Sequence, residues 1–183
     1  MTEEQKMKAG LVYDAADAEL VAHIVDCHDR LFDYNRLRPS DIEARTRTIK
    51  EILGAKGEVV PINQPFRCDY GKHIRVGERF FANFNLTILD EAEVTFGDDC
   101  FVGPNVGIYT ACHDIDPVER NSRREWAEPV RIGHSVWIGG GVTILPGVTI
   151  GNNVTIGAGS VVVHDLPDNV VAVGNPARVV KRV

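Results

Sequence analysis

The second half of the chain repeats an aliphatic residue at every sixth position. One ladder occupies six consecutive repeats, at Ile132, Ile138, Ile144, Ile150, Ile156 and Val162. An amphipathic helix repeats at about 3.6 residues and a half-buried strand at about two, so neither produces this pattern. A six-residue period is typical of parallel β-helices. Three hexapeptides are expected to close one triangular coil, with the aliphatic side chains stacked inside it.

The same period extends upstream with two interruptions. Phe96, Val102 and Ile108 keep the six-residue spacing, but Val76 precedes Phe96 by 20 residues, which predicts a two-residue insertion in that coil. Between Ile108 and Ile132 the register is kept over 24 residues, yet residues 109–129 carry no hexapeptide pattern. We expect this segment to leave one corner as a long loop, and loops of that length are commonly functional.

Residues 1–57 show helical periodicity instead. Apolar side chains between positions 17 and 34 recur at spacings of three and four, at Leu20, Ile24, Cys27, Leu31 and Tyr34. Pro39-Ser40-Asp41 predicts the start of a second helix, and Gly54 and Gly57 predict its end. The predicted organisation is therefore a helical segment, residues 1–57, followed by a β-helix over residues 58–183 with loop 109–129 and a C-terminal tail.

Composition narrows the class of protein. With 183 residues, 44% of them hydrophobic, the chain is long enough for one domain with a core. A net charge of -6 argues against a nucleic-acid partner, and no apolar run is long enough to predict a membrane span. The four cysteines lack metal-ligand spacing, and the N-terminus lacks a secretory signal. We therefore expect reduced thiols and a cytoplasmic protein.

Several segments are more specific than the repeat. They are KAG at 8–10, FRCDYG at 66–71, FFANF at 80–84, IDPV at 115–118 and GNPAR at 174–178. Together with the repeat, they resemble the maltose and galactoside O-acetyltransferases, a family of hexapeptide-repeat acyltransferases, over nearly the whole chain. The resemblance implies a left-handed parallel β-helix that transfers the acetyl group of acetyl-CoA to a sugar hydroxyl of the maltose, glucose or galactoside type. It also implies a homotrimer with active sites between neighbouring chains, and no metal.

The resemblance also implies roles for individual residues. His113 matches the family's catalytic base, and a histidine that is mostly neutral near pH 7 can accept the proton of an attacking hydroxyl. Asn83 matches a position that holds the acceptor and stabilises the transition state. The implied acceptor-binding residues are Asp69, Glu125 and an acidic residue of the first helix, for which Asp17 is favoured over Asp14. The implied coenzyme-binding residues are Trp137, Gly140, Ala158, Val163, His164, Arg178 and Lys181.

Other interpretations stay open on the residues alone. Asn83 also fits a corner asparagine, the acidic helix residues fit a solvated face, and the C-terminal cations fit a solvated tail. Cys112 adjoins His113, but neighbours in extended chain point to opposite faces, which argues against a Cys/His pair. A zinc enzyme of the carbonic anhydrase type needs three histidines, whereas position 118 is valine and His73 has no evident partner. A non-sugar acceptor and a non-catalytic scaffold are the remaining alternatives.

Overall fold

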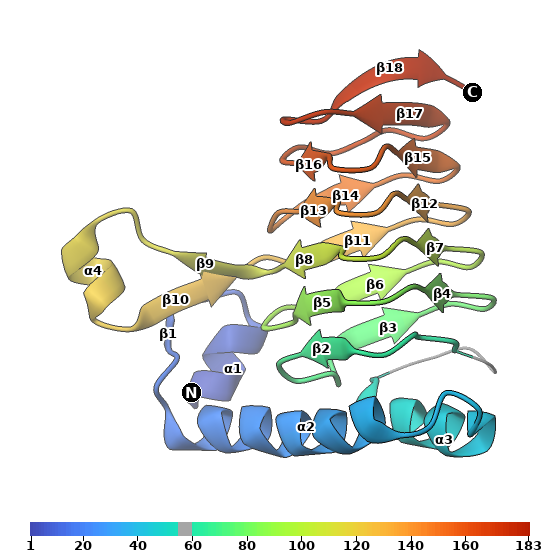
Figure 1. The fold of residues 1–183 in the computed structure, drawn as a ribbon. Coiled ribbons are helices and arrows are strands. Elements are labelled where there is room, and N and C mark those ends of the chain that lie inside the picture. Colours follow the sequence, from blue (N-terminus) through green and yellow to red (C-terminus); the bar gives the residue numbers. More distant parts are fainter. Residues whose placement is uncertain (55–59) are drawn as a thin grey trace.

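A three-sided solenoid of short parallel strands stands on a helical base, as the computed structural model shows for residues 1–54 and 60–183 (Figure 1). The first face consists of β3 (Ile74–Val76), β6 (Val94–Phe96), β11 (Val130–Ile132) and β14 (Thr149–Ile150). The second face consists of β4 (Phe81–Ala82), β7 (Phe101–Val102), β12 (Trp137–Ile138), β15 (Val154–Ile156), β17 (Val170–Val173) and β18 (Arg178–Arg182). The third face consists of β2 (Phe66–Cys68), β5 (Leu86–Leu89), β8 (Gly107–Tyr109), β13 (Thr143–Ile144) and β16 (Val161–Val162).

The aliphatic ladder forms the core of this solenoid, as predicted. Ile132 pairs in register with Ile150, and Ile138 with Ile156, so equivalent residues stack one coil apart. These side chains are fully or almost fully buried. Branched side chains suit such a wall because they pack well on a pleated surface with few rotamers to lose. The predicted fold class, a mainly β solenoid of the hexapeptide-repeat type, is confirmed.

Both interruptions of the period occur at one edge of the prism. Val76 pairs with Phe96, which confirms the two-residue insertion, and the spacing shows that it lies between Ile88 and Phe96. The long excursion leaves the next coil at the same edge, between β8 and β11. We call this the arm edge, formed by residues 69–73, 90–93, 110–129, 145–148 and 163–165. The edge between the second and third faces, residues 83–85, 103–105, 139–141 and 157–159, is called the glycine edge.

The excursion predicted as a loop is an ordered arm. Its strands β9 (Ala111–His113) and β10 (Arg124–Ala127) are antiparallel, and the short helix α4 (Pro117–Asn121) lies between them. The N-terminal strand β1 (Tyr13–Asp14) adds to β10 from the other side. The arm therefore projects from the solenoid as a three-stranded sheet that joins two distant parts of the chain (Figure 1).

The N-terminal helices cover the lower end of the solenoid. They are α1 (Glu3–Lys8), α2 (Ala18–Arg36) and α3 (Ile42–Ile52). The predicted apolar stripe of α2 is buried at Leu20, Cys27, Leu31 and Tyr34, whereas Ile24 is half-buried. The predicted helix end at Gly57 and the predicted boundary after it lie outside the described residues. Within residues 1–54 and 60–183, no helix combines the length and apolar character needed to cross a bilayer.

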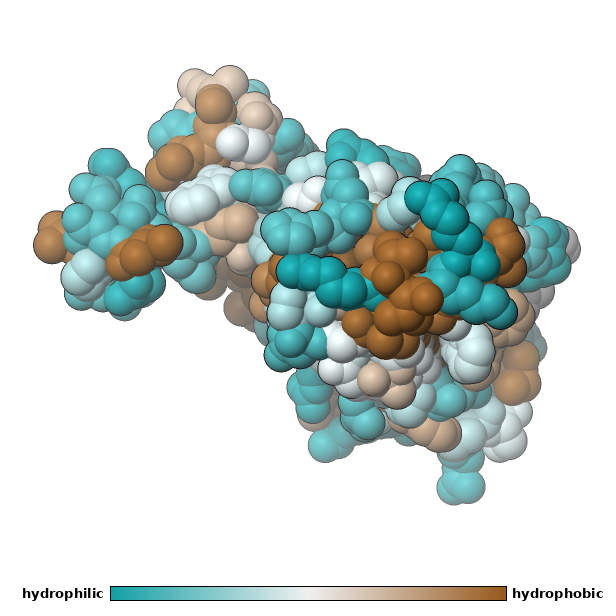
Figure 2. All heavy atoms as spheres, turned by 90° about the horizontal axis from the view of Figure 1, so that it is seen from above, coloured by the Kyte–Doolittle hydropathy of each residue, from teal (hydrophilic) through white to brown (hydrophobic). Residues whose placement is uncertain are grey.

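The upper end of the solenoid is closed by β18, which runs antiparallel to β17. Seen from above, this end has an apolar centre flanked by hydrophilic side chains (Figure 2). The exposed valines of this region are Val173, Val179, Val180 and Val183. The cations Arg178, Lys181 and Arg182 belong to the same strand, so the C-terminal strand combines apolar surface with positive charge.

Candidate active site on the arm

The arm brings His113, Glu125 and Tyr13 together. In the register of the sheet, Glu125 lies opposite His113 on one side and opposite Tyr13 on the other. The Nε2 atom of His113 is 3.5 Å from Oε2 of Glu125, and the Tyr13 hydroxyl donates a hydrogen bond to Oε1. The Glu125 side chain is 11% exposed and that of His113 54%, so a nearly buried carboxylate faces an accessible imidazole.

This geometry suits His113 to accept a proton. A carboxylate beside Nε2 favours the tautomer with the proton on that atom, which leaves the Nδ1 lone pair free. Burial and the hydrogen bond to Glu125 raise the pKa of Tyr13, so its hydroxyl stays protonated and keeps donating. His113 and Glu125 border a hollow of about 440 Å³, whose other lining residues are Ala15, Ala16, Val21, Arg120 and Arg123.

Cys112 lies on the other face of the same strand. It pairs with Trp126, one position from the His113–Glu125 pair, and is not among the residues that line the His113 hollow. Burial raises the pKa of the Cys112 thiol to about 11, so the thiol is protonated near neutral pH. This arrangement agrees with the expectation that Cys112 and His113 do not form a catalytic pair.

Three more carboxyl groups lie on the arm edge beneath the arm. Asp69 Oδ1 is 3.3 Å from His28 Nε2, and Asp90 Oδ1 accepts hydrogen bonds from the backbone N–H groups of Asp69 and Tyr70. Glu91 Oε2 accepts a hydrogen bond of 3.2 Å from the Thr110 hydroxyl. This layer connects the predicted acceptor residue Asp69 to the root of the arm.

Burial changes the acidity of this layer. It raises the pKa of Asp90 to about 7 and, together with a hydrogen bond to Asp69, raises the pKa of Glu91 to about 9. Glu91 is therefore protonated near neutral pH and can donate a hydrogen bond. The sequence interpretation missed Asp90 and Glu91, although the two-residue insertion that contains them was visible as a break in the period.

Asn83 lies on the glycine edge, away from the arm. Its backbone N–H donates to Val102 O, and its side-chain Oδ1 accepts from the Phe84 N–H at 2.8 Å. The predicted coenzyme residues Gly140 and Ala158 belong to the next coils of this glycine edge. The coils approach closely here, since a Cβ atom added at Gly139 would lie 2.6 Å from Ala158 N. One chain therefore does not bring Asn83 and His113 together.

The other predicted coenzyme residues are spread over the upper coils. Val163 and the exposed His164 lie on the arm edge, and Trp137, 59% exposed, lies on the outer side of the second face. Arg178 and Lys181 belong to β18, where Lys181 pairs with Val171. These positions are distributed around the upper prism, on the arm edge, the second face and β18.

The two acidic candidates of the N-terminal segment have local roles. Asp17 is the N-cap of α2, where its carboxylate accepts hydrogen bonds from the Glu19 and Leu20 N–H groups. Asp14 accepts from the Ala16 N–H. Neither residue lines the hollow beside His113. An acceptor role for Asp17 or Asp14 stays a prediction.

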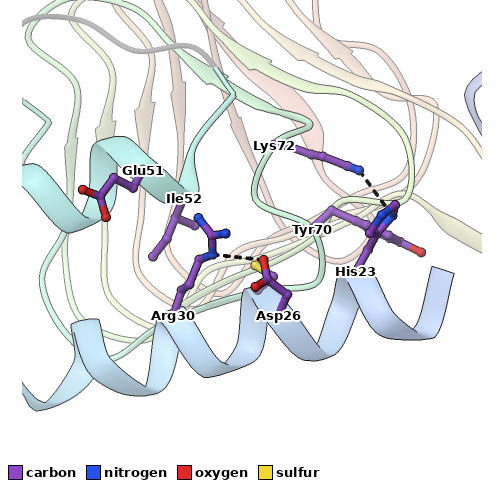
Figure 3. Close-up of a pocket in the computed structure, with 8 residues that line it drawn as sticks. His23, Asp26, Arg30, Glu51, Ile52, Tyr70 and Lys72 are labelled. Atoms are coloured by element: carbon purple, nitrogen blue, oxygen red, sulfur yellow. Dashed lines mark hydrogen bonds and ion pairs between the residues drawn. The ribbon is translucent and has the colours of Figure 1, made fainter. Parts of the chain in front are cut away.

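A second hollow, of about 160 Å³, lies between α2, α3 and the corner after β2 (Figure 3). Its polar side chains largely satisfy one another, because Arg30 pairs with Asp26 at 3.0 Å and Lys72 Nζ lies 3.5 Å from His23 Nδ1. None of the predicted site residues lines it. Among the residues that the structure describes, no group of three or more His, Cys, Asp or Glu side chains is arranged to hold a metal ion.

Two family descriptions match the chain. The maltose acetyltransferase hexapeptide capping motif matches residues 6–57, and the bacterial transferase hexapeptide (six repeats) matches residues 129–164. The first match covers the helical base and the second covers the regular coils above the arm. Fold and sequence together therefore define a hexapeptide-repeat transferase.

Individual relatives narrow this class. The crystal structure of a maltose O-acetyltransferase from Clostridium difficile 630 has a TM-score of 0.99 and 48% identity, covering 100% of this chain and 98% of that one. A galactoside acetyltransferase in complex with coenzyme A has a TM-score of 0.95 and 38% identity, covering 100% and 91%. The galactoside O-acetyltransferase of Escherichia coli (strain K12) is 42% identical over 153 residues, which are 84% of this chain and 75% of that protein.

The chain belongs to the maltose and galactoside O-acetyltransferase family of hexapeptide-repeat acyltransferases. The predicted family and the predicted enzyme class, an acetyltransferase, are confirmed. The roles of the individual site residues stay predictions, as do the acceptor and the oligomeric state.

Proposed function

We propose that this acetyltransferase moves the acetyl group of acetyl-CoA to a hydroxyl of a sugar, with His113 as the general base. The observation that carries the proposal is the accessible His113 imidazole held against the nearly buried Glu125 beside a hollow. The names of the relatives favour a maltose- or galactoside-type acceptor, and a glucose-type acceptor is part of the proposal because maltose is built of glucose units. The relative in complex with coenzyme A supports acetyl-CoA as the donor.

The donor fits the cations at the top of the solenoid. Lys181 and Arg182 make no ion pair within the described part of the chain, and both are exposed on β18, so they can bind phosphates. The backbone N–H groups of the half-buried Gly140 and the exposed Ala158 offer donors for the amides of the donor arm. Acetyl-CoA supplies a thioester that is already activated, so no acyl-enzyme is needed.

The residues of the chain then have the following roles. His113 accepts the proton of the acceptor hydroxyl as the oxygen attacks the thioester carbon, and it returns the proton to the leaving sulfur. Glu125 stabilises the imidazolium that forms between these events, and Tyr13 holds Glu125 in place. The Asn83 amide donates a hydrogen bond to the oxygen that gains negative charge. Asp69, on the same edge as His113, offers an acceptor for sugar hydroxyls.

The proposed active assembly is a homotrimer. His113 is carried by the arm edge and Asn83 by the glycine edge, so a second chain is needed to bring the two side chains to one acceptor. The exposed apolar side chains Ile115 and Val118 near the arm tip, 91% and 74% exposed, support contact of the arm with another surface.

The proposal is tested by following thiol release from acetyl-CoA with maltose, glucose and a methyl galactoside as acceptors. His113→Ala should lower kcat by about a hundredfold or more, because it removes the base. His23→Ala is the matched control, since His23 lies in the second hollow and should keep wild-type rates (Figure 3).

Three outcomes would contradict parts of the proposal. Undiminished turnover in His113→Ala would overturn the role of the base. Turnover with a non-sugar alcohol alone would overturn the acceptor class, and failure to bind any CoA ester would favour a scaffold.

A further inference from the structure

The hollow beside His113 contains a cation that has no partner in the described part of the chain. Two arginines line it, Arg120 and Arg123. Arg120 is used structurally, because its Nη1 donates to the carbonyl oxygens of Asp114 and Ile115 at 3.1 Å. The guanidinium of Arg123 makes no hydrogen bond or ion pair with any described residue, and the residue is exposed. A charged, unpaired side chain thus faces the space next to the proposed base.

The backbone of Arg123 makes this position unusual. Its φ is +62°, a left-handed conformation that glycine and asparagine adopt more readily than arginine. Arg79 is the other arginine with a positive φ among the described residues, and it binds Asp99 through two hydrogen bonds of 2.6 and 2.7 Å. Arg123 has no such compensation within the described chain. A residue kept in an unfavourable backbone conformation beside an active site points to a function.

The charge of the hollow favours an anion. Glu125 is the acidic residue of its lining, and this carboxylate already accepts from Tyr13 and faces His113. Arg120 and Arg123 therefore leave positive charge on the wall. The next residue, Arg124, lines a different hollow with Glu3 and Asp14, so it does not add to this wall and provides a matched control.

We propose that Arg123 binds an anionic group of the acceptor, so that the preferred acceptor is a sugar derivative that carries a phosphate or carboxylate. Guanidinium binds both groups through paired, charge-assisted hydrogen bonds. This inference rests on the proposed function and specifies its substrate class.

The test compares acceptors that share the sugar and differ in charge. Glucose 1-phosphate is compared with methyl α-glucoside, and 4-carboxyphenyl β-glucoside with phenyl β-glucoside; all four have a free primary hydroxyl. The wild-type kcat/KM should favour the anionic member by about ten- to a hundredfold at low salt. Arg123→Asn, which tolerates the positive φ, should abolish this preference by lowering kcat/KM for the anionic acceptors toward that for their neutral partners. Arg124→Gln should keep the wild-type preference.

The two anionic acceptors separate a phosphate site from a carboxylate site. Equal kcat/KM for charged and neutral acceptors in the wild-type protein would overturn the inference while the proposed function stands. The inference also fails if Arg123→Asn raises only the KM for acetyl-CoA, because the arginine then binds the donor.

Binding of glucose 1-phosphate is also measured by calorimetry without acetyl-CoA. This measurement judges the inference even if no sugar is acetylated, a result that would refute the proposed function. Weaker binding to Arg123→Asn than to the wild-type protein supports the inference, and equal binding refutes it.

Discussion

The carboxyl groups on the arm edge differ in their burial and in their hydrogen-bond partners. Glu125 accepts a hydrogen bond from the Tyr13 hydroxyl and faces the His113 imidazole. Glu91 is buried beside another carboxyl group, Asp69, and its pKa is raised to about 9. The same edge therefore presents a carboxyl group beside His113 and, below it, a protonated acid that is buried against Asp69.

Glu91 gives a prediction for stability against pH. The pKa of this carboxyl is raised from 4.5 to about 9, so between these values the folded chain binds one proton more than the unfolded chain. The free energy of unfolding should therefore fall as pH rises through this interval, by about 1.4 kcal/mol per pH unit from this group. Asp90 adds a fall of the same sign up to about pH 7. Glu91→Gln should flatten the dependence by about one proton.

The measurement is urea unfolding from pH 5.5 to 8.5 at one fixed protein concentration. Glu119→Gln is the control, because Glu119 is an exposed residue of the short helix α4. This control should show the wild-type slope. A Glu91→Gln variant with an unchanged slope would show that Glu91 is ionised in the folded chain.

At the residue scale, the site was partly predictable from the sequence. The resemblance identified His113 and Glu125, and the structure holds them 3.5 Å apart. Tyr13 was not identified, because it lies 112 residues from Glu125 and no periodic pattern links them. Asp17 was favoured as an acceptor residue, yet an acidic residue before a helix also fits an N-cap, and this is the role that the structure shows. Local sequence does not distinguish these two uses of a carboxylate.

At the scale of elements, α2 protects the lower edge of the third face. Strand β2 is the last strand of that sheet, so its outward backbone groups need partners. Asn35 supplies both, because its Nδ2 donates to Phe66 O and its Oδ1 accepts from Phe66 N–H, each at 2.9 Å. The helix thus ends the sheet with one amide side chain in place of a further strand.

The contact of Asn35 with β2 predicts a large loss of stability from a single substitution. Asn35→Ala leaves one backbone donor and one acceptor of β2 without partners, which should lower the free energy of unfolding by about 2–4 kcal/mol. Asn121→Ala on the exposed helix α4 should change it by less than about 0.5 kcal/mol. Both are measured by chemical denaturation at equal protein concentration. Equal values for the two variants would mean that water replaces Asn35 without loss.

Elements that repeat were predicted better than elements that do not. The period predicted the pairing of Ile132 with Ile150, because every coil stacks an aliphatic side chain on the equivalent side chain of the coil below. Residues 109–129 gave no such signal, and they form two strands and a helix instead of a loop. Their structure depends on β1, which pairs with β10 from the far end of the chain. The residue pattern of segment 109–129 alone carries no information about β1, so it could not predict this sheet.

For the whole molecule, the separation of two edges has a direct consequence. His113 lies on the arm, whereas Asn83 lies on the glycine edge. The third face of the prism separates the arm edge from the glycine edge (Figure 1). If both residues act on one acceptor, they come from different chains. A ring of identical chains satisfies this condition, since each arm can reach the glycine edge of its neighbour.

This arrangement predicts recovery of activity between two inactive variants. His113→Ala and Asn83→Ala should each be strongly impaired alone. When the two chains are unfolded together, mixed one to one and refolded, an arm with His113 meets a neighbour with Asn83 in about a quarter of the sites of a ring. The mixture should therefore regain about a quarter of the wild-type rate, and sedimentation should give a trimer. Refolding each variant separately and then mixing is the control, because without exchange of chains it should recover nothing. An active monomer, or a co-refolded mixture no more active than its parts, would mean that one chain completes the site by itself.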